Sequence, residues 1–148
     1  MKGENYIKRR LCLIESAAMA QLTLAAHRVL LRLELELLNH AGKNNGALIV
    51  TYNDFEQFGV RRMSIAPAMR LLVRVGLIEV TDRGWRAAEH GRPAKYRLTY
   101  LPAYGKPPTD EWASWIPRAT SGNGRRTPPL PNVTDCSSEN ATTENKIQ

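Results

Sequence analysis

The fold of this chain depends on one stretch, GVRRMSIAPAMRLLVRVGLIEV, which runs from Gly59 to Val80. It contains several arginines and apolar residues that recur with the period of a helix. At its end, apolar and polar residues alternate, as they do in a β-strand. At about 100° per residue, one side of a helix through this stretch carries Ile65, Ala68, Met69 and Leu72. We expect that side to face a hydrophobic core, and the residues from Leu77 onward to form a strand.

The opposite side of the same helix carries Met63, Pro67, Arg70 and Arg74. A proline inside a helix costs about 3 kcal/mol, whereas a proline in the first turn loses no hydrogen bond, because that N–H has no partner within the helix. We therefore predict that Ser64 is the N-cap. Arg61 and Arg62 then lie in the preceding turn, near the positive end of the helix, where phosphates bind.

The sequence upstream predicts the helices that pack against this one. The strongest signal begins at Thr23, a plausible N-cap, and its apolar stripe is Ala26, Val29, Leu30, Leu33 and Leu37. Leu31, Leu35 and Leu38 lie off that stripe. Either a shorter helix over residues 13–22 covers them, which we favour, or they form a dimer surface.

A short β-type run and a further helix connect these two segments. The run is ALIV, residues 47–50, and the helix follows in TYNDFEQFGV. Thr51 is a good N-cap, and Asp54 is favourable beside the positive end of the helix. We expect Phe55 and Phe58 to point inward and Gly59 to turn the chain.

Two segments that alternate apolar and polar residues predict an antiparallel hairpin. They are GLIEVTDRG, residues 76–84, and AKYRLTYL, residues 94–101, in which Tyr96 and Leu98 alternate with Arg97 and Thr99. A polar, glycine-containing loop joins them. The predicted order is helix, helix, short strand, helix, turn, helix, strand, loop, strand, which is the order of a helix-turn-helix followed by a two-stranded wing.

These residues resemble the winged helix-turn-helix family. The matching positions are Gly59-Val60, Ile65, Ala68-Met69, Leu72 and Gly76-Leu77-Ile78. From about Leu13 to Pro102, the chain is similar to small winged-helix proteins of bacterial plasmids, prophages and integrated elements. The resemblance implies a mostly α fold with a small β-hairpin (α+β). It also implies sequence-specific binding of double-stranded DNA for transcription regulation on a mobile genetic element. Plasmid replication or maintenance, and a protein-interaction adaptor, are the alternatives.

The charge distribution also favours nucleic acid. The chain carries a formal charge of +7, and residues 59–100 hold nine basic and three acidic residues, a difference of +6. The predicted DNA-binding residues are Arg61, Arg62, Met63, Ser64, Pro67, Arg70, Arg74, Arg83, Arg86, Arg92 and Lys95. We expect residues 59–75 to dock at the major groove, and the loop over residues 83–93 to contact the adjacent backbone or the minor groove.

The composition changes after the predicted hairpin, where seven of the nine prolines lie between Pro102 and the C-terminus. We predict a flexible N-terminus over 1–10, a winged helix-turn-helix domain over 11–102, a short docking segment over 103–118 and a disordered tail over 119–148. Trp112, Trp115 and Ile116 are the side chains expected to dock.

No pattern in the sequence predicts catalysis, a cofactor, a metal site or a small-molecule ligand. The three histidines are scattered, and two cysteines are too few for a zinc site. The apolar run over residues 11–14 is too short for a secretory signal, and no apolar stretch approaches the roughly 20 residues of a membrane span. We therefore expect a cytoplasmic, non-enzymatic protein that binds double-stranded DNA. A homodimer formed through its leucines is a further hypothesis.

Overall fold

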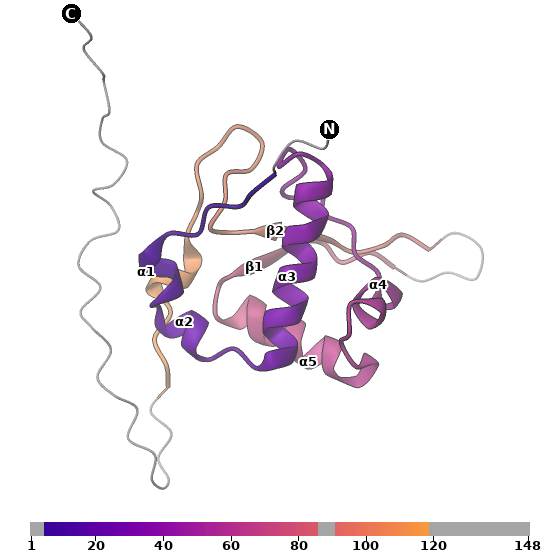
Figure 1. Cartoon of the computed structure of the whole chain (residues 1–148), viewed down its shortest axis with the longest axis horizontal. Coiled ribbons are helices and arrows are strands. Elements are labelled where there is room, and N and C mark those ends of the chain that lie inside the picture. Colours follow the sequence, from indigo (N-terminus) through magenta and orange to yellow (C-terminus); the bar gives the residue numbers. More distant parts are fainter. Residues whose placement is uncertain (1–4, 86–90, 119–148) are drawn as a thin grey trace, which may run out of the picture.

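A computed structural model of the chain describes residues 5–85 and 91–118 (Figure 1). Its elements are α1 (Leu11–Ile14), α2 (Ala17–Ala20), α3 (Leu24–Asn39), α4 (Tyr52–Gln57), α5 (Arg62–Arg74), β1 (Ile78–Asp82), β2 (Lys95–Leu98) and the 3₁₀ helix η1 (Glu111–Ser114). The fold is mixed α and β, with helices and one antiparallel two-stranded hairpin, as the sequence predicted. Arg86 and the predicted tail over 119–148 lie outside the described residues.

The helix predicted over residues 13–22 is instead two single turns, α1 and α2. Ser16 separates them: its hydroxyl donates to the Leu13 carbonyl at 2.7 Å and accepts the Met19 N–H at 3.2 Å. A serine side chain that bonds to nearby backbone groups competes with a continuous helix. The prediction of one helix was therefore wrong.

Helix α3 begins and buries its stripe as predicted. Thr23 caps it by accepting the Ala26 N–H at 3.2 Å. All five residues of the stripe are buried. Leu31 and Leu35, however, are 46% and 39% exposed, because α1 and α2 lie to one side of α3 (Figure 1). The expectation that a first helix covers these two leucines was wrong.

Helix α4 has the predicted cap. Thr51 and Asp54 form a capping box, in which each side chain accepts the backbone N–H of the other residue. Phe55 is fully buried, but Phe58 is 36% exposed, so its predicted inward position was wrong. Phe58 is the C-cap of α4, where the chain already turns toward Gly59, whose φ is +88°.

Helix α5 begins earlier than predicted. Arg61 is its N-cap and Arg62 its first residue, so Ser64 lies in the first turn and Pro67 lies inside the helix. Pro67 removes the N–H that would bond to the Met63 carbonyl, but Met63 is 92% exposed, so water can hydrate that carbonyl. The predicted buried side of α5 is confirmed: Ile65, Ala68, Met69 and Leu72 are all buried.

The β1–β2 hairpin has its predicted orientation, with Ile78 opposite Leu98. A β-bulge interrupts the register between Val80 and Asp82. The predicted short strand over residues 47–50 is reduced to one bridge between Leu48 and Tyr96. Thr99, which follows β2, is 1% exposed although it is polar, and its hydroxyl donates to the Gly76 carbonyl at 2.6 Å.

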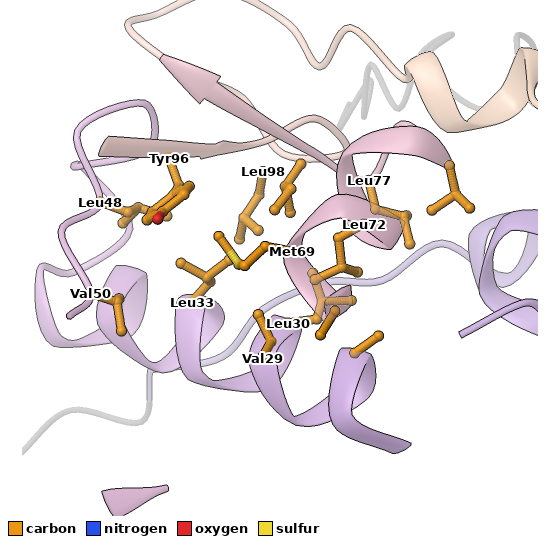
Figure 2. Close-up of a cluster of buried hydrophobic side chains, with 14 of the residues drawn as sticks. Val29, Leu30, Leu33, Leu48, Val50, Met69, Leu72, Leu77, Tyr96 and Leu98 are labelled. Atoms are coloured by element: carbon orange, nitrogen blue, oxygen red, sulfur yellow. The ribbon is translucent and has the colours of Figure 1, made fainter. Parts of the chain in front are cut away.

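The core fills the space between α3, α5 and the hairpin (Figure 2). Side chains from these three elements point toward one another there: Val29, Leu30, Leu33, Met69, Leu72, Tyr96 and Leu98. This packing holds α5 with one side against the core and the other side outward, which is what positions the candidate site.

Two buried polar residues at the edges of this core form hydrogen bonds to distant segments of the chain. Asn45, 1% exposed, accepts the Leu98 N–H at 2.8 Å and donates to the Leu98 carbonyl at 2.9 Å. Glu34, 6% exposed, accepts the Tyr100 hydroxyl at 2.6 Å and the Arg9 Nε–H at 2.9 Å. Burial and the neighbouring carboxylate raise the pKa of Tyr100 well above its ordinary value. Through its hydrogen bond to Glu34, Arg9 attaches the N-terminal segment to α3.

The segment after the hairpin docks through one tryptophan. Trp112 is 2% exposed, and Arg10 lies over its ring. The backbone at Trp112 passes so close to Gly76 that a Cβ there would lie 2.7 Å from the Trp112 nitrogen. Trp115 is half-buried, whereas Ile116 is 80% exposed and does not dock as predicted.

Candidate nucleic-acid interface

A groove with a volume of about 830 Å³ lies between the outward side of α5 and the β1–β2 hairpin. Its apolar lining includes Ala66, Met69, Val73, Ile78, Val80, Ala94 and Tyr96. Its basic residues are Arg70 and Arg74 from α5 and Arg83 from the residues after β1. The fold thus brings three of the predicted contact residues, from two separate elements, around one concave surface.

The outward side of α5 forms a ridge of four residues: Met63, Pro67, Arg70 and Arg74. All four are exposed. At 100° per residue they fall within a sector of about 60°, so they form one row along the helix. We call this row the α5 ridge. Arg61, also exposed, precedes it at the N-cap, whereas Ser64 is half-buried.

Two predicted contact residues are engaged in exposed ion pairs. Arg62 lies 2.7 Å from Glu56, and its guanidinium is 5.8 Å from the centre of the Tyr52 ring. Arg92 lies 2.7 Å from Asp82. Exposed pairs of this kind contribute about 0–1 kcal/mol, so either arginine can exchange its carboxylate for another anion at little cost.

Several other predicted contact residues form no ion pair with a described residue, although Lys95 lies opposite Asp82 across the hairpin and its charge helps to lower the pKa of that carboxyl. Within residues 5–85 and 91–118, those that form no ion pair are Arg61, Arg70, Arg74, Arg83 and Lys95. The positive charge of Arg70 and Arg74 on the α5 ridge, and of Arg83 after β1, therefore has no ion-pair partner among the described residues. Such charge attracts anions, and the low-dielectric wall of a groove strengthens the attraction.

The far part of the hairpin is held in a defined shape. Trp85 and Arg92 exchange two backbone hydrogen bonds, of 2.9 and 2.8 Å. Between β1 and this pair, the Gly84 N–H donates to Asp82 at 3.0 Å, and this bond lowers the pKa of that carboxyl. A Cβ at Gly84 would lie 2.3 Å from the Arg92 carbonyl oxygen, so only glycine fits there. Trp85 itself is 54% exposed.

Sequence reasoning missed the acidic end of the groove. Arg97, whose side chain is 13% exposed, lies 2.7 Å from Glu79 and 3.0 Å from Glu111. Glu111 comes from the docked segment, and nothing in its local sequence indicates this contact. Arg97 is thereby committed to structure, and the positive charge of the groove lies with Arg70, Arg74 and Arg83.

The described part of the chain offers no group of three or more His, Cys, Asp or Glu side chains that could hold a metal ion. Its helices, over the same residues, are all too short or too polar to cross a membrane. No protein-family model, curated protein or solved structure matches the chain. The function of the groove is therefore inferred from its geometry and charge.

Proposed function

We propose that this protein binds double-stranded DNA through the α5 ridge and the β1–β2 hairpin, in the manner of a winged helix-turn-helix protein. One observation carries the proposal: Arg70, Arg74 and Arg83 surround a single groove and have no ion-pair partner among the described residues. A duplex offers the closely spaced phosphates that such a surface requires.

The arrangement of elements supports this proposal. Helices α4 and α5 are joined by residues 58–61, with Gly59 at φ +88°, and α5 leads directly into the hairpin. A short, glycine-containing turn between two helices, followed by a hairpin, is typical of a helix-turn-helix with a wing. An α-helix about 10–12 Å wide fits a major groove about 12 Å wide. In this proposal α5 enters that groove, and the hairpin contacts the backbone or the minor groove beside it.

The biological role we propose is transcription regulation on a bacterial mobile genetic element. The resemblance of the chain from about Leu13 to Pro102 to small winged-helix proteins of bacterial plasmids, prophages and integrated elements supports it. Plasmid replication or maintenance is the second role, and it needs the same interface. Both roles require a protein that recognises one duplex sequence among many.

We further propose that two copies associate through α3. Leu24, Leu31 and Leu35 are 70%, 46% and 39% exposed and recur at i, i+7 and i+11, the spacing of a coiled-coil seam. A two-fold dimer would present two copies of α5 to half-sites about 34–36 Å apart. Analytical ultracentrifugation at high protein concentration tests this, and a clean monomer would contradict it.

Salt dependence tests the DNA-binding proposal. Fluorescence anisotropy with a random-sequence duplex would measure Kd over a range of salt concentrations. For the wild type, log K should fall steeply with log salt. The Arg70→Ala/Arg74→Ala variant should show a slope that is shallower by about 0.9 for each lost phosphate contact.

The matched control removes the same charge elsewhere. Lys43 and Lys106 are exposed and do not line the groove. The Lys43→Ala/Lys106→Ala variant should keep the wild-type slope. Equal slopes for all three proteins would contradict the proposal and favour a protein-interaction adaptor, for which the exposed Met63 would be a contact residue.

A further inference from the structure

We infer that the α5 ridge recognises the C5-methyl groups of thymines through Met63 and Pro67, next to a guanine bound by Arg70. This inference rests on the proposed function, because it names the bases that the same interface selects. It also accounts for apolar side chains at positions where a DNA-contacting helix usually carries polar ones.

The first observation is the exposure of Met63. At 92% it is the most exposed large apolar side chain among the described residues. Single exposed apolar residues are common on protein surfaces, so exposure alone indicates nothing. Met63, however, lies in one row with Arg70 and Arg74, which have no ion-pair partner in the described chain. An exposed apolar side chain in one row with these two arginines fits a partner surface that is anionic and also carries apolar groups.

The second observation is what α5 lacks. Its sequence, RMSIAPAMRLLVR, contains no Asn, Gln, Asp or Glu. The amide side chains that bind adenine, and the carboxylates that accept a hydrogen bond from the N4 amino group of cytosine, are therefore absent from the helix. The remaining major-groove features that its outward side can recognise are guanine, by arginine, and the thymine methyl group, by apolar contact.

The third observation is the spacing along the ridge. Met63 and Arg70 are seven residues apart, or about 10 Å along the helix axis. Base pairs are about 3.4 Å apart along one DNA strand. A helix lying along the groove would thus place Met63 and Arg70 over bases about three steps apart, with Pro67 between them. The preferred site should carry thymines on one side of a guanine at this separation.

Replacing thymine with deoxyuridine tests the inference, because the two bases differ only in the C5-methyl group. A duplex would first be selected from a random-sequence pool by the full-length protein. Each thymine of that duplex would then be replaced in turn. Burial of one methyl group corresponds to about a fourfold change in Kd. We expect this loss at one or two positions for the wild type, and Met63→Ala should show no loss at the position that Met63 contacts.

Two further proteins make the result specific. Leu11→Ala removes a comparably exposed apolar side chain from α1, 68% exposed, and should retain the full response to deoxyuridine. Arg70→Ala should relax the preference for guanine while leaving the thymine response in place. Because Met63 and Arg70 are exposed, thermal unfolding should confirm that these variants fold like the wild type.

The outcomes separate the inference from the proposed function. If deoxyuridine weakens binding equally in the wild type and in Met63→Ala, or in neither, the methyl inference is overturned, while arginine-dependent binding keeps the proposed function. If no duplex is enriched and Arg70→Ala/Arg74→Ala binds DNA as the wild type does, both fail together.

Discussion

Replacing Asn45 with Asp should strongly destabilise the protein, in a way that depends on pH. The Asn45 side chain is 1% exposed and makes four hydrogen bonds. Its amide nitrogen donates to the carbonyl oxygens of Leu98, Leu101 and Pro102, at 2.9, 3.1 and 3.1 Å. Aspartate keeps the acceptor for the Leu98 N–H but places a second oxygen opposite these three carbonyls.

The magnitude follows from the lost donors. The Asn45 amide has two N–H groups for the three carbonyl oxygens, and a protonated Asp offers a single O–H in their place, so at least one buried carbonyl loses its bond from residue 45, at a cost of about 1–3 kcal/mol. The protonated variant should therefore be less stable than the wild type by about 2 kcal/mol. Ionisation makes the variant worse still, because a buried carboxylate would face carbonyl oxygens with no cation beside it.

The pH dependence follows from the pKa of the new carboxyl. Burial and the carbonyl oxygens should raise its pKa in the folded state, compared with about 3.9 in the unfolded chain. Between these two values the folded state binds more protons, so stability falls as pH rises, by up to about 1.4 kcal/mol per pH unit. The loss should begin above about pH 4 and end at the folded-state pKa.

Denaturant unfolding of the wild type and the variant at a series of pH values would measure this difference. Asn44→Asp is the control: this neighbour makes no side-chain hydrogen bond to another described residue, and it adds the same charge. If Asn45→Asp matched the wild type, or lost the same free energy at every pH, the four-bond description of Asn45 would be refuted.

Three other substitutions test local features. Gly76→Ala should lower stability by at least about 1 kcal/mol and expose Trp112 to water, because the φ of Gly76 is +79° and a Cβ there would meet the backbone of Glu111 and Trp112. Unfolding curves would measure the stability, and tryptophan fluorescence would measure the exposure. Thr51→Ala should lower stability by about 1 kcal/mol through loss of the capping box. Hydrogen bonds from Thr51 lower the pKa of Asp54 in the folded state, so the wild type should be more stable than Asp54→Asn when this carboxyl is ionised. This difference in stability should be complete above about pH 4 and should disappear as the pH falls through the lowered pKa. Pro67→Ala should raise the free energy of unfolding by up to about 3 kcal/mol, and no gain would contradict an interior position for this proline.

The sequence predicted features that depend on periodicity and caps. The buried stripe of α3, the Thr51 cap and the inward side of α5 follow from side-chain spacing that a helix fixes locally. The antiparallel hairpin follows in the same way from alternation. The outward side of α5 was predictable for the same reason, and with it the α5 ridge.

Features that depend on a distant partner were not predictable. Asn45 looks like a loop residue until Leu98, 53 positions later, supplies the groups that it bonds. Glu34 looks like a surface residue of a helix until Arg9 and Tyr100 surround it. The start of α5 was misjudged for a different reason. The avoidance of an interior proline is only a local preference, and in the structure α5 begins at Arg62 and carries Pro67 inside it.

Ion pairing decides which basic residues are available to an anionic partner, and a count of charged residues does not reveal that pairing. Arg97 counts toward the +6 of residues 59–100, yet two carboxylates surround it and its side chain is 13% exposed. It holds the hairpin to the docked segment, and withdrawing it for a phosphate would leave Glu79 and Glu111 unpaired. Arg62 and Arg92 differ, because their pairs are exposed and weak enough to exchange. If the proposed interface is correct, Arg97→Ala should therefore change stability more than the salt slope of DNA binding, whereas Arg70→Ala should do the reverse.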